Sequence, residues 1–210
     1  FICKARFEGN NSGVQYRSKL VNEQTLRVVG YQADLHPAQK NFGMLYGEGL
    51  GRGVIASRGQ KIVVNTDGKK TVSGEVGNNA TLNNAEWNEL RIVAVGNRLI
   101  HRINGVTTVD ITDNHAKALS KGILALQLHA GPPMTVEFRN LRLRHLEGQQ
   151  AKAVLAAAAN SKAPSIKQET TNLAPAANDK WLRDAPAPKW IWTQRSGNGQ
   201  QVWFRKSFDL

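Results

Sequence analysis

Short runs in which apolar and polar residues alternate fill most of the chain from residue 1 to about residue 147, and turns rich in Gly and Asn separate them. Because successive side chains of a strand point to opposite faces of a sheet, this pattern predicts an all-β domain with antiparallel strands. The clearest segment is 87–110, where Gly96-Asn97 and Asn104-Gly105 separate three β-rich runs and predict a three-strand meander. Other strands are expected at 1–7, 13–18, 27–35, 43–47, 53–57, 60–65, 71–76, 122–129 and 134–146. So many short strands favour a two-sheet antiparallel sandwich, or jelly roll, over an α/β fold.

Three of the expected strands carry polar residues at every second position. The polar pairs are Gln15 and Arg17, Gln32 and Asp34, and Gln127 and His129, and the apolar residues between and beside them are Val14, Tyr16, Ala33, Leu35, Leu126 and Leu128. If these strands share a sheet, the apolar set lines the core and the polar set gathers on the opposite face. An ordinary solvated sheet face explains the periodicity alone. The residue types, which are not the Lys, Glu and Thr usual on a solvated face, favour a sugar-binding or catalytic surface.

The composition changes at Gly148. Residues 148–180 are rich in Ala and Pro and poor in large apolar side chains, so they are predicted to form a linker between domains. A helix over 151–159 is compatible with the sequence, but a helix of this length is marginal on its own. Residues 181–210 hold four of the five Trp residues and are interpreted as the first strands of a second, truncated β domain. Strand-like runs at both ends lead us to expect a fragment of a longer protein.

The charge of the chain narrows the range of partners. The formal net charge is +12, but the longest basic run is a pair such as Lys69-Lys70, so we expect no specific nucleic-acid partner. No apolar run has the length of a membrane-spanning helix. The single Cys excludes a disulfide framework within the chain and a zinc cluster built on Cys.

Four segments, in this order, resemble the 3-keto-disaccharide hydrolase family, formerly a domain of unknown function. They are 11–18 (NSGVQYRS), 30–34 (GYQAD), 43–48 (GMLYGE) and 125–141 (ALQLHAGPPMTVEFRNL). The resemblance covers residues 1 to about 147 and implies the concanavalin A-like lectin/glucanase jelly roll. Members usually carry a further segment before the strand that opens this chain. The Trp-rich tail is similar to the start of a galactose-binding-like domain.

The resemblance implies cleavage of 3-keto-glycosides, including 3-keto-disaccharides. A 3-keto group acidifies the proton on C2, so a general base can remove that proton while a cation or hydrogen-bond donor stabilises the enolate oxygen. The C1 substituent then leaves by β-elimination, and water adds afterwards. Direct hydrolysis by two carboxylates is the alternative, and both routes stay open here.

Carried over position by position, the resemblance implies roles for nine residues. The acid/base candidates are Asp34, Glu48 and His129, and the candidates for binding the sugar are Arg17, Gln32, Gln127, Asn11, Tyr46 and Arg52. Asn11 is also expected to order a turn, and Arg52 lies in a Gly-rich segment expected to form a loop at the edge of the cleft. A divalent metal bound by the three acid/base candidates is a further hypothesis, because carboxylate and imidazole suit several divalent ions.

Two other functions compete with the enzyme. A non-catalytic, lectin-like carbohydrate-binding module needs the same polar face, and an anionic polymer could bind through the net charge. The loop 35–42 departs from the family's pattern, so the identity of the substrate stays open, and His36 offers a polar contact there. We expect a bacterial, multidomain protein that acts outside the cytoplasm, periplasmic or secreted. The sequence does not predict the oligomeric state.

Overall fold

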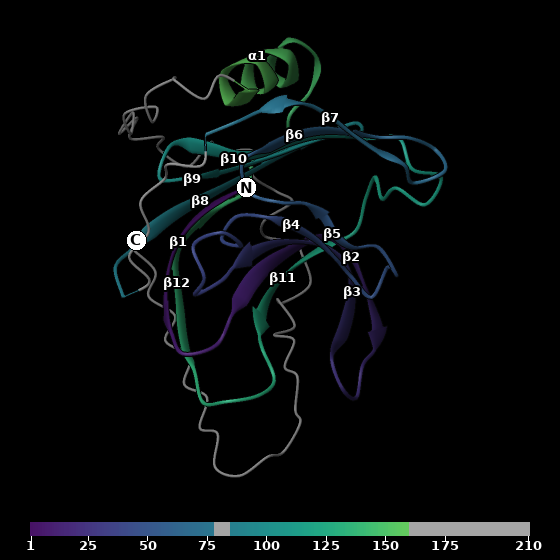
Figure 1. The fold of residues 1–210 in the computed structure, drawn as a ribbon. Coiled ribbons are helices and arrows are strands. Elements are labelled where there is room, and N and C mark those ends of the chain that lie inside the picture. Colours follow the sequence, from purple (N-terminus) through teal and green to yellow (C-terminus); the bar gives the residue numbers. More distant parts are fainter. Residues whose placement is uncertain (78–84, 160–210) are drawn as a thin grey trace, which may run out of the picture.

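Two β-sheets packed face to face and one helix make up the part of the chain that the structure, a computed structural model, describes, which is residues 1–77 and 85–159 (Figure 1). The strands are β1 (Ile2–Glu8), β2 (Ser12–Asn22), β3 (Arg27–Leu35), β4 (Leu45–Glu48), β5 (Gly53–Ala56), β6 (Gln60–Val64), β7 (Lys70–Glu75), β8 (Asn88–Val95), β9 (Arg98–Ile103), β10 (Val106–Asp113), β11 (Ile123–Leu128) and β12 (Thr135–Arg142), and the helix is α1 (Gly148–Ala159). The larger sheet has the order β12-β1-β8-β9-β10-β6-β7 and the smaller one β11-β2-β3-β4-β5. All neighbours are antiparallel except β6 and β10. The predicted all-β sandwich is confirmed.

The predicted meander is confirmed as β8, β9 and β10. Asn104 and Gly105 both have positive φ (48° and 81°), as a type I′ turn requires. At the first turn Gly96 alone has positive φ (54°), which is the pattern of a type II′ turn. Glycine and asparagine therefore act here through the backbone conformations that they tolerate.

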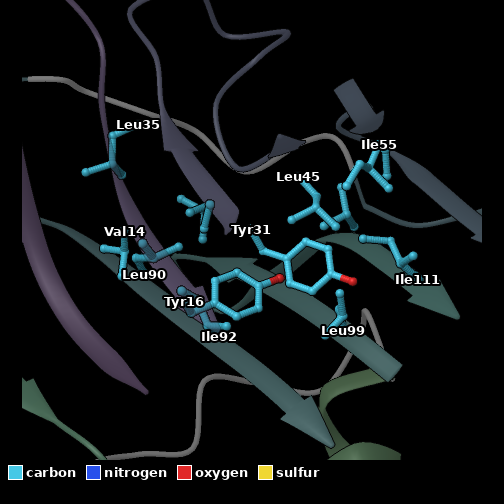
Figure 2. Packing of buried hydrophobic residues seen from close by; sticks show 14 of the residues in the cluster. Val14, Tyr16, Tyr31, Leu35, Leu45, Ile55, Leu90, Ile92, Leu99 and Ile111 are labelled. Atoms are coloured by element: carbon cyan, nitrogen blue, oxygen red, sulfur yellow. The ribbon is translucent and has the colours of Figure 1, made fainter. Parts of the chain in front are cut away.

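The core lies between the sheets (Figure 2). Four of the six predicted core residues, Val14, Tyr16, Ala33 and Leu35, are buried there; Leu126 is partly buried against the core, and Leu128, at the end of the edge strand β11, is partly exposed. Two tyrosines of the smaller sheet also bond across the core. The Tyr16 hydroxyl lies 2.9 Å from Nε2 of His101, and the Tyr31 hydroxyl donates to Asp113 at 2.5 Å.

Helix α1 packs on the outer face of the larger sheet (Figure 1). Ala158 joins Val93 and Ile100 in a second apolar cluster, and the Thr107 hydroxyl donates to the Ala158 carbonyl at 2.6 Å. The first twelve residues of the predicted linker are thus part of the folded unit, because packing against the sheet supplies the stability that a helix this short lacks alone. The rest of the predicted linker and the predicted second domain, 181–210, lie outside the described residues. Within residues 1–77 and 85–159, no helix is long and apolar enough to cross a membrane.

Candidate functional site

A polar surface covers the outward side of the smaller sheet, on the four neighbouring strands β11, β2, β3 and β4. We call it the polar face; its residues are Gln15, Gln32, Asp34, Tyr46, Glu48 and Gln127. They alternate along their strands with residues that face the core, as predicted. Gln32 lies between Gln15 on β2 and Tyr46 on β4 in the sheet register, whereas Gly13 lies between Gln127 on β11 and Asp34 on β3.

Three glutamines of the polar face form a hydrogen-bonded chain, the amide chain of Gln15, Gln32 and Gln127. Gln15 Nε2 donates to Gln32 Oε1 at 3.0 Å, and Gln32 Nε2 donates to Gln127 Oε1 at 3.1 Å. Gln32 Nε2 also donates to Asp34 Oδ1 at 2.5 Å. The Gln32 side chain crosses directly over Gly13, where an added Cβ would lie 2.7 Å from Gln32 Cγ. A glycine on β2 therefore makes room for the contact between β3 and β11.

Asp34 is a buried carboxyl on this otherwise neutral part of the face. The residue is 3% exposed. Its pKa is raised from 3.8 to about 7, mainly by burial; the hydrogen bond from Gln32 opposes the rise, and the charge of Glu48 adds to it. Both protonation states of such a carboxyl are populated at neutral pH, which suits a general base or acid.

Glu48 stands apart from Asp34 along the sheet. It pairs with Gly30, four residues before Asp34 on β3, a backbone separation of about 13 Å along the strand. The structure therefore places one buried carboxyl beside the amide chain, bonded to Gln32, and a second, more exposed one farther along the same face.

Two histidines follow the strands that carry Asp34 and Gln127. His129 Nδ1 lies 3.0 Å from Nδ2 of Asn10 and 2.5 Å from the Ala130 carbonyl oxygen. Nδ1 of His36 accepts the backbone N–H of Ala38 at 2.9 Å. Leu35 and Leu128, the residues before the two histidines, both pair with Ser12, so the histidines follow at the same end of the sheet. Burial lowers the pKa of His36, and the charge of His129 contributes to the lowering. The loop 35–42, which differs from the family's pattern, thus brings a second imidazole, that of His36, to the end of the polar face.

Arg17 does not lie on the polar face, contrary to the expected alternation. The pairing of β2 with β3 shifts register between Tyr16 and Lys19, and Arg17 has a positive φ of 49°. Its guanidinium donates to the carbonyls of Gly96 (2.7 Å), in the turn between β8 and β9, and Leu119 (3.0 Å), in the segment between β10 and β11. A β-bulge therefore redirects the side chain.

Arg52 also lies away from the polar face. Its two Nη atoms donate to the Asp113 carboxylate at 2.8 and 2.9 Å, and these side chains are only 9% and 1% exposed. Burial opposes ionisation of Asp113, but the hydrogen bonds from Arg52 and Tyr31 lower its pKa overall. The Gly-rich turn between β4 and β5 thus directs Arg52 into an ion pair between the sheets, rather than toward a cleft edge.

Asn10 is a residue that the sequence analysis missed, and it takes the turn-ordering role expected of Asn11. Asn10 Oδ1 accepts the backbone N–H of Asn11 at 2.9 Å, and its Nδ2 donates to the Ala130 carbonyl at 3.1 Å. It thereby connects the β1–β2 turn to the segment of His129. The adjacent Gly9-Asn10-Asn11 sequence signals a turn, but nothing in it indicates the contact with a residue 119 positions away.

The metal hypothesis finds no preformed site in this arrangement. Among residues 1–77 and 85–159, no three His, Cys, Asp or Glu side chains lie close enough together to hold a metal ion. Asp34, Glu48 and His129 are thus not brought together as a set of metal ligands.

Comparison with known proteins agrees with the resemblance seen in the sequence. No curated protein matches the chain. A family model described as the 3-keto-alpha-glucoside-1,2-lyase-like domain matches residues 1–144, which comprise the whole sandwich from β1 to β12 and end before α1. The chain therefore belongs to the 3-keto-alpha-glucoside-1,2-lyase-like domain family.

Proposed function

We propose that this domain cleaves 3-keto-glycosides on its polar face by elimination, with Asp34 as the general base. The observation that carries the proposal is the Asp34 carboxyl, which is almost fully buried, held by Gln32, and has a pKa raised to about 7. Membership of a family named for lyase-like action on a 3-keto-glucoside supports an enzymatic role and a sugar substrate.

The chemistry needs a base of this strength. The 3-keto group makes the C2 proton acidic, and ionised Asp34 removes it to form an enolate on the C3 oxygen. The enolate electrons return to form the C1–C2 double bond, the bond from C1 to the glycosidic oxygen breaks, and the departing oxygen takes up a proton. Water then adds across the C1–C2 double bond to give the free 3-keto sugar.

The neighbouring groups can supply hydrogen bonds to the charge that develops. The Gln127 amide and the imidazoles of His129 and His36 lie around Asp34 or at the same end of the face, and an N–H donor near the C3 oxygen stabilises the enolate. Direct hydrolysis needs two carboxyls about 5–10 Å apart across the glycosidic bond. Glu48 pairs with Gly30, four residues before Asp34, and its charge still raises the pKa of Asp34, so we base the choice of elimination on the buried carboxyl of Asp34 and not on the spacing of the two carboxyls.

The test compares a 3-keto-glucoside with the same glucoside left unoxidised, and follows release of the aglycone by the wild-type chain and by Asp34→Asn. We expect release from the keto substrate alone, and at least a 100-fold loss in the variant. A folded protein that binds the sugar without releasing the aglycone would instead be a lectin-like module. Binding that falls steeply with salt and does not depend on the sugar would indicate an anionic polymer as the partner.

A further inference from the structure

The amide chain has a defined direction, because a glutamine offers an acceptor at one end of its amide and two donor hydrogens at the other. Gln32 Oε1 accepts from Gln15, while its Nε2 donates to Asp34 and Gln127. Rotating the Gln32 amide by a half turn would set its oxygen against the oxygens of Asp34 and Gln127, and its NH2 against the NH2 of Gln15. Contacts on both sides therefore hold the amide in one orientation.

Because the amides are buried, losing one of these hydrogen bonds costs free energy that water cannot readily restore. Gln15 is 5% exposed and Gln32 is 2% exposed, so bulk water does not reach their amides freely. Without Gln15, the buried Gln32 oxygen loses its donor, and only the acceptors Asp34 and Gln127 still hold the amide in this orientation.

We propose that Gln15 is a positioning residue of this site, which acts through Gln32 to direct an N–H toward Oδ1 of Asp34 and so makes Oδ2 the oxygen that exchanges the proton with substrate. An N–H donor at Oδ1 stabilises the ionised carboxylate. When Asp34 is protonated, the proton sits on Oδ2, because Oδ1 already faces a donor. The catalytic part of this inference rests on the proposed function, whereas the effect of Gln15 on the Asp34 carboxyl does not.

The test replaces Gln15 with Met, which keeps the length of the side chain and removes its amide. The Asp34 carboxyl is titrated by NMR with carbon-13-labelled Asp, and Asp34→Asn identifies its resonance. We expect the pKa of Asp34 to rise by about one unit, the size of a lost hydrogen bond to a charged group. Tyr46 and Glu48 on β4, His36 after β3 and His129 after β11 are the other titratable groups at this face, and the substitution leaves all four in place.

Catalysis gives a second readout. With less carboxylate at neutral pH, kcat/KM for the keto substrate should fall about five-fold at pH 7 and change little at pH 9, with KM nearly unchanged. A merely structural role of Gln15 would lower the rate at all pH values without moving the profile. The matched control is Gln60→Met on the larger sheet. This variant should show the same pKa of Asp34 and the same pH profile of kcat/KM as the wild type.

An unchanged pKa of Asp34 in folded Gln15→Met would overturn the inference. If that variant does not fold, nuclear Overhauser contacts in the wild-type protein provide the test. The Gln32 NH2 protons should show contacts with Gln127 and Asp34. Contacts of that NH2 with Gln15 alone would overturn the inference. If the chain cleaves no keto substrate but the titration shifts as expected, the proposed function fails while the role of Gln15 in setting the Asp34 carboxyl stands.

Discussion

The buried carboxyl of Asp34 should make the fold less stable above neutral pH, and removing its charge should restore that stability. The pKa of Asp34 is raised from 3.8 to about 7, mainly by burial. The folded state therefore keeps a proton that the unfolded chain releases. This contributes stability that is fully present below pH 3.8 and is lost as the pH rises to about 7. The shift corresponds to about 4 kcal/mol, which we take as an upper limit.

Asp34→Asn tests this directly, because Asn has the same shape and keeps the oxygen that accepts from Gln32. Urea unfolding of both proteins at pH 4, 6 and 8 gives the difference in unfolding free energy. We expect almost no difference at pH 4 and a gain of about 2–4 kcal/mol for the variant at pH 8. Glu75→Gln, on the exposed edge strand β7, is the control and should show no such trend. An Asp34→Asn protein that is no more stable than the wild type at pH 8 would refute the reasoning, since Asp34 would then ionise without cost.

Three further perturbations test other parts of the structure. In Gly13→Ala, the new methyl stands 2.7 Å from the amide chain, so release of aglycone should fall about ten-fold or more, whereas Gly74→Ala, with its nearest neighbour at 3.8 Å, should keep the wild-type rate. Asp113→Asn leaves the Arg52 guanidinium between the sheets without its carboxylate and should cost about 3 kcal/mol in urea unfolding; a cost below about 1 kcal/mol would mean that the pair is well solvated. Burial lowers the pKa of His101 from 6.5 to about 4, so its contribution is present above pH 6.5 and lost as the pH falls toward 4, by about 3 kcal/mol at most. His101→Gln should therefore flatten the acid side of the stability curve, and an unchanged curve would contradict the burial of a neutral ring.

Local patterns in the sequence were sufficient to predict the fold and most of the residues of the polar face. Alternation with period two is a property of each strand alone, so it correctly assigned Gln32, Asp34 and Gln127 to one face. The Gly and Asn turns of the meander likewise require positive φ regardless of the rest of the chain.

Tertiary effects account for what the sequence analysis missed. The bulge that turns Arg17 away depends on how β2 pairs with β3, and period-two counting assumes that no bulge intervenes. Arg52 meets its carboxylate partner 61 residues away, so its burial has no local signal. Helix α1 is stabilised by packing on the larger sheet, and the helix propensity of its residues does not predict such packing.

The most direct test of the central claim follows the hydrogen on C2. A 3-keto-glucoside deuterated at C2 is cleaved in ordinary water, and mass spectrometry measures deuterium in the sugar product at early times, with Asp34→Asn and a sample without protein as controls for spontaneous exchange. Elimination with Asp34 as the base predicts a product that has lost its deuterium as fast as the aglycone is released by the wild type, and almost no release by the variant. A product that keeps its deuterium while the aglycone is released would show direct hydrolysis and contradict this mechanism.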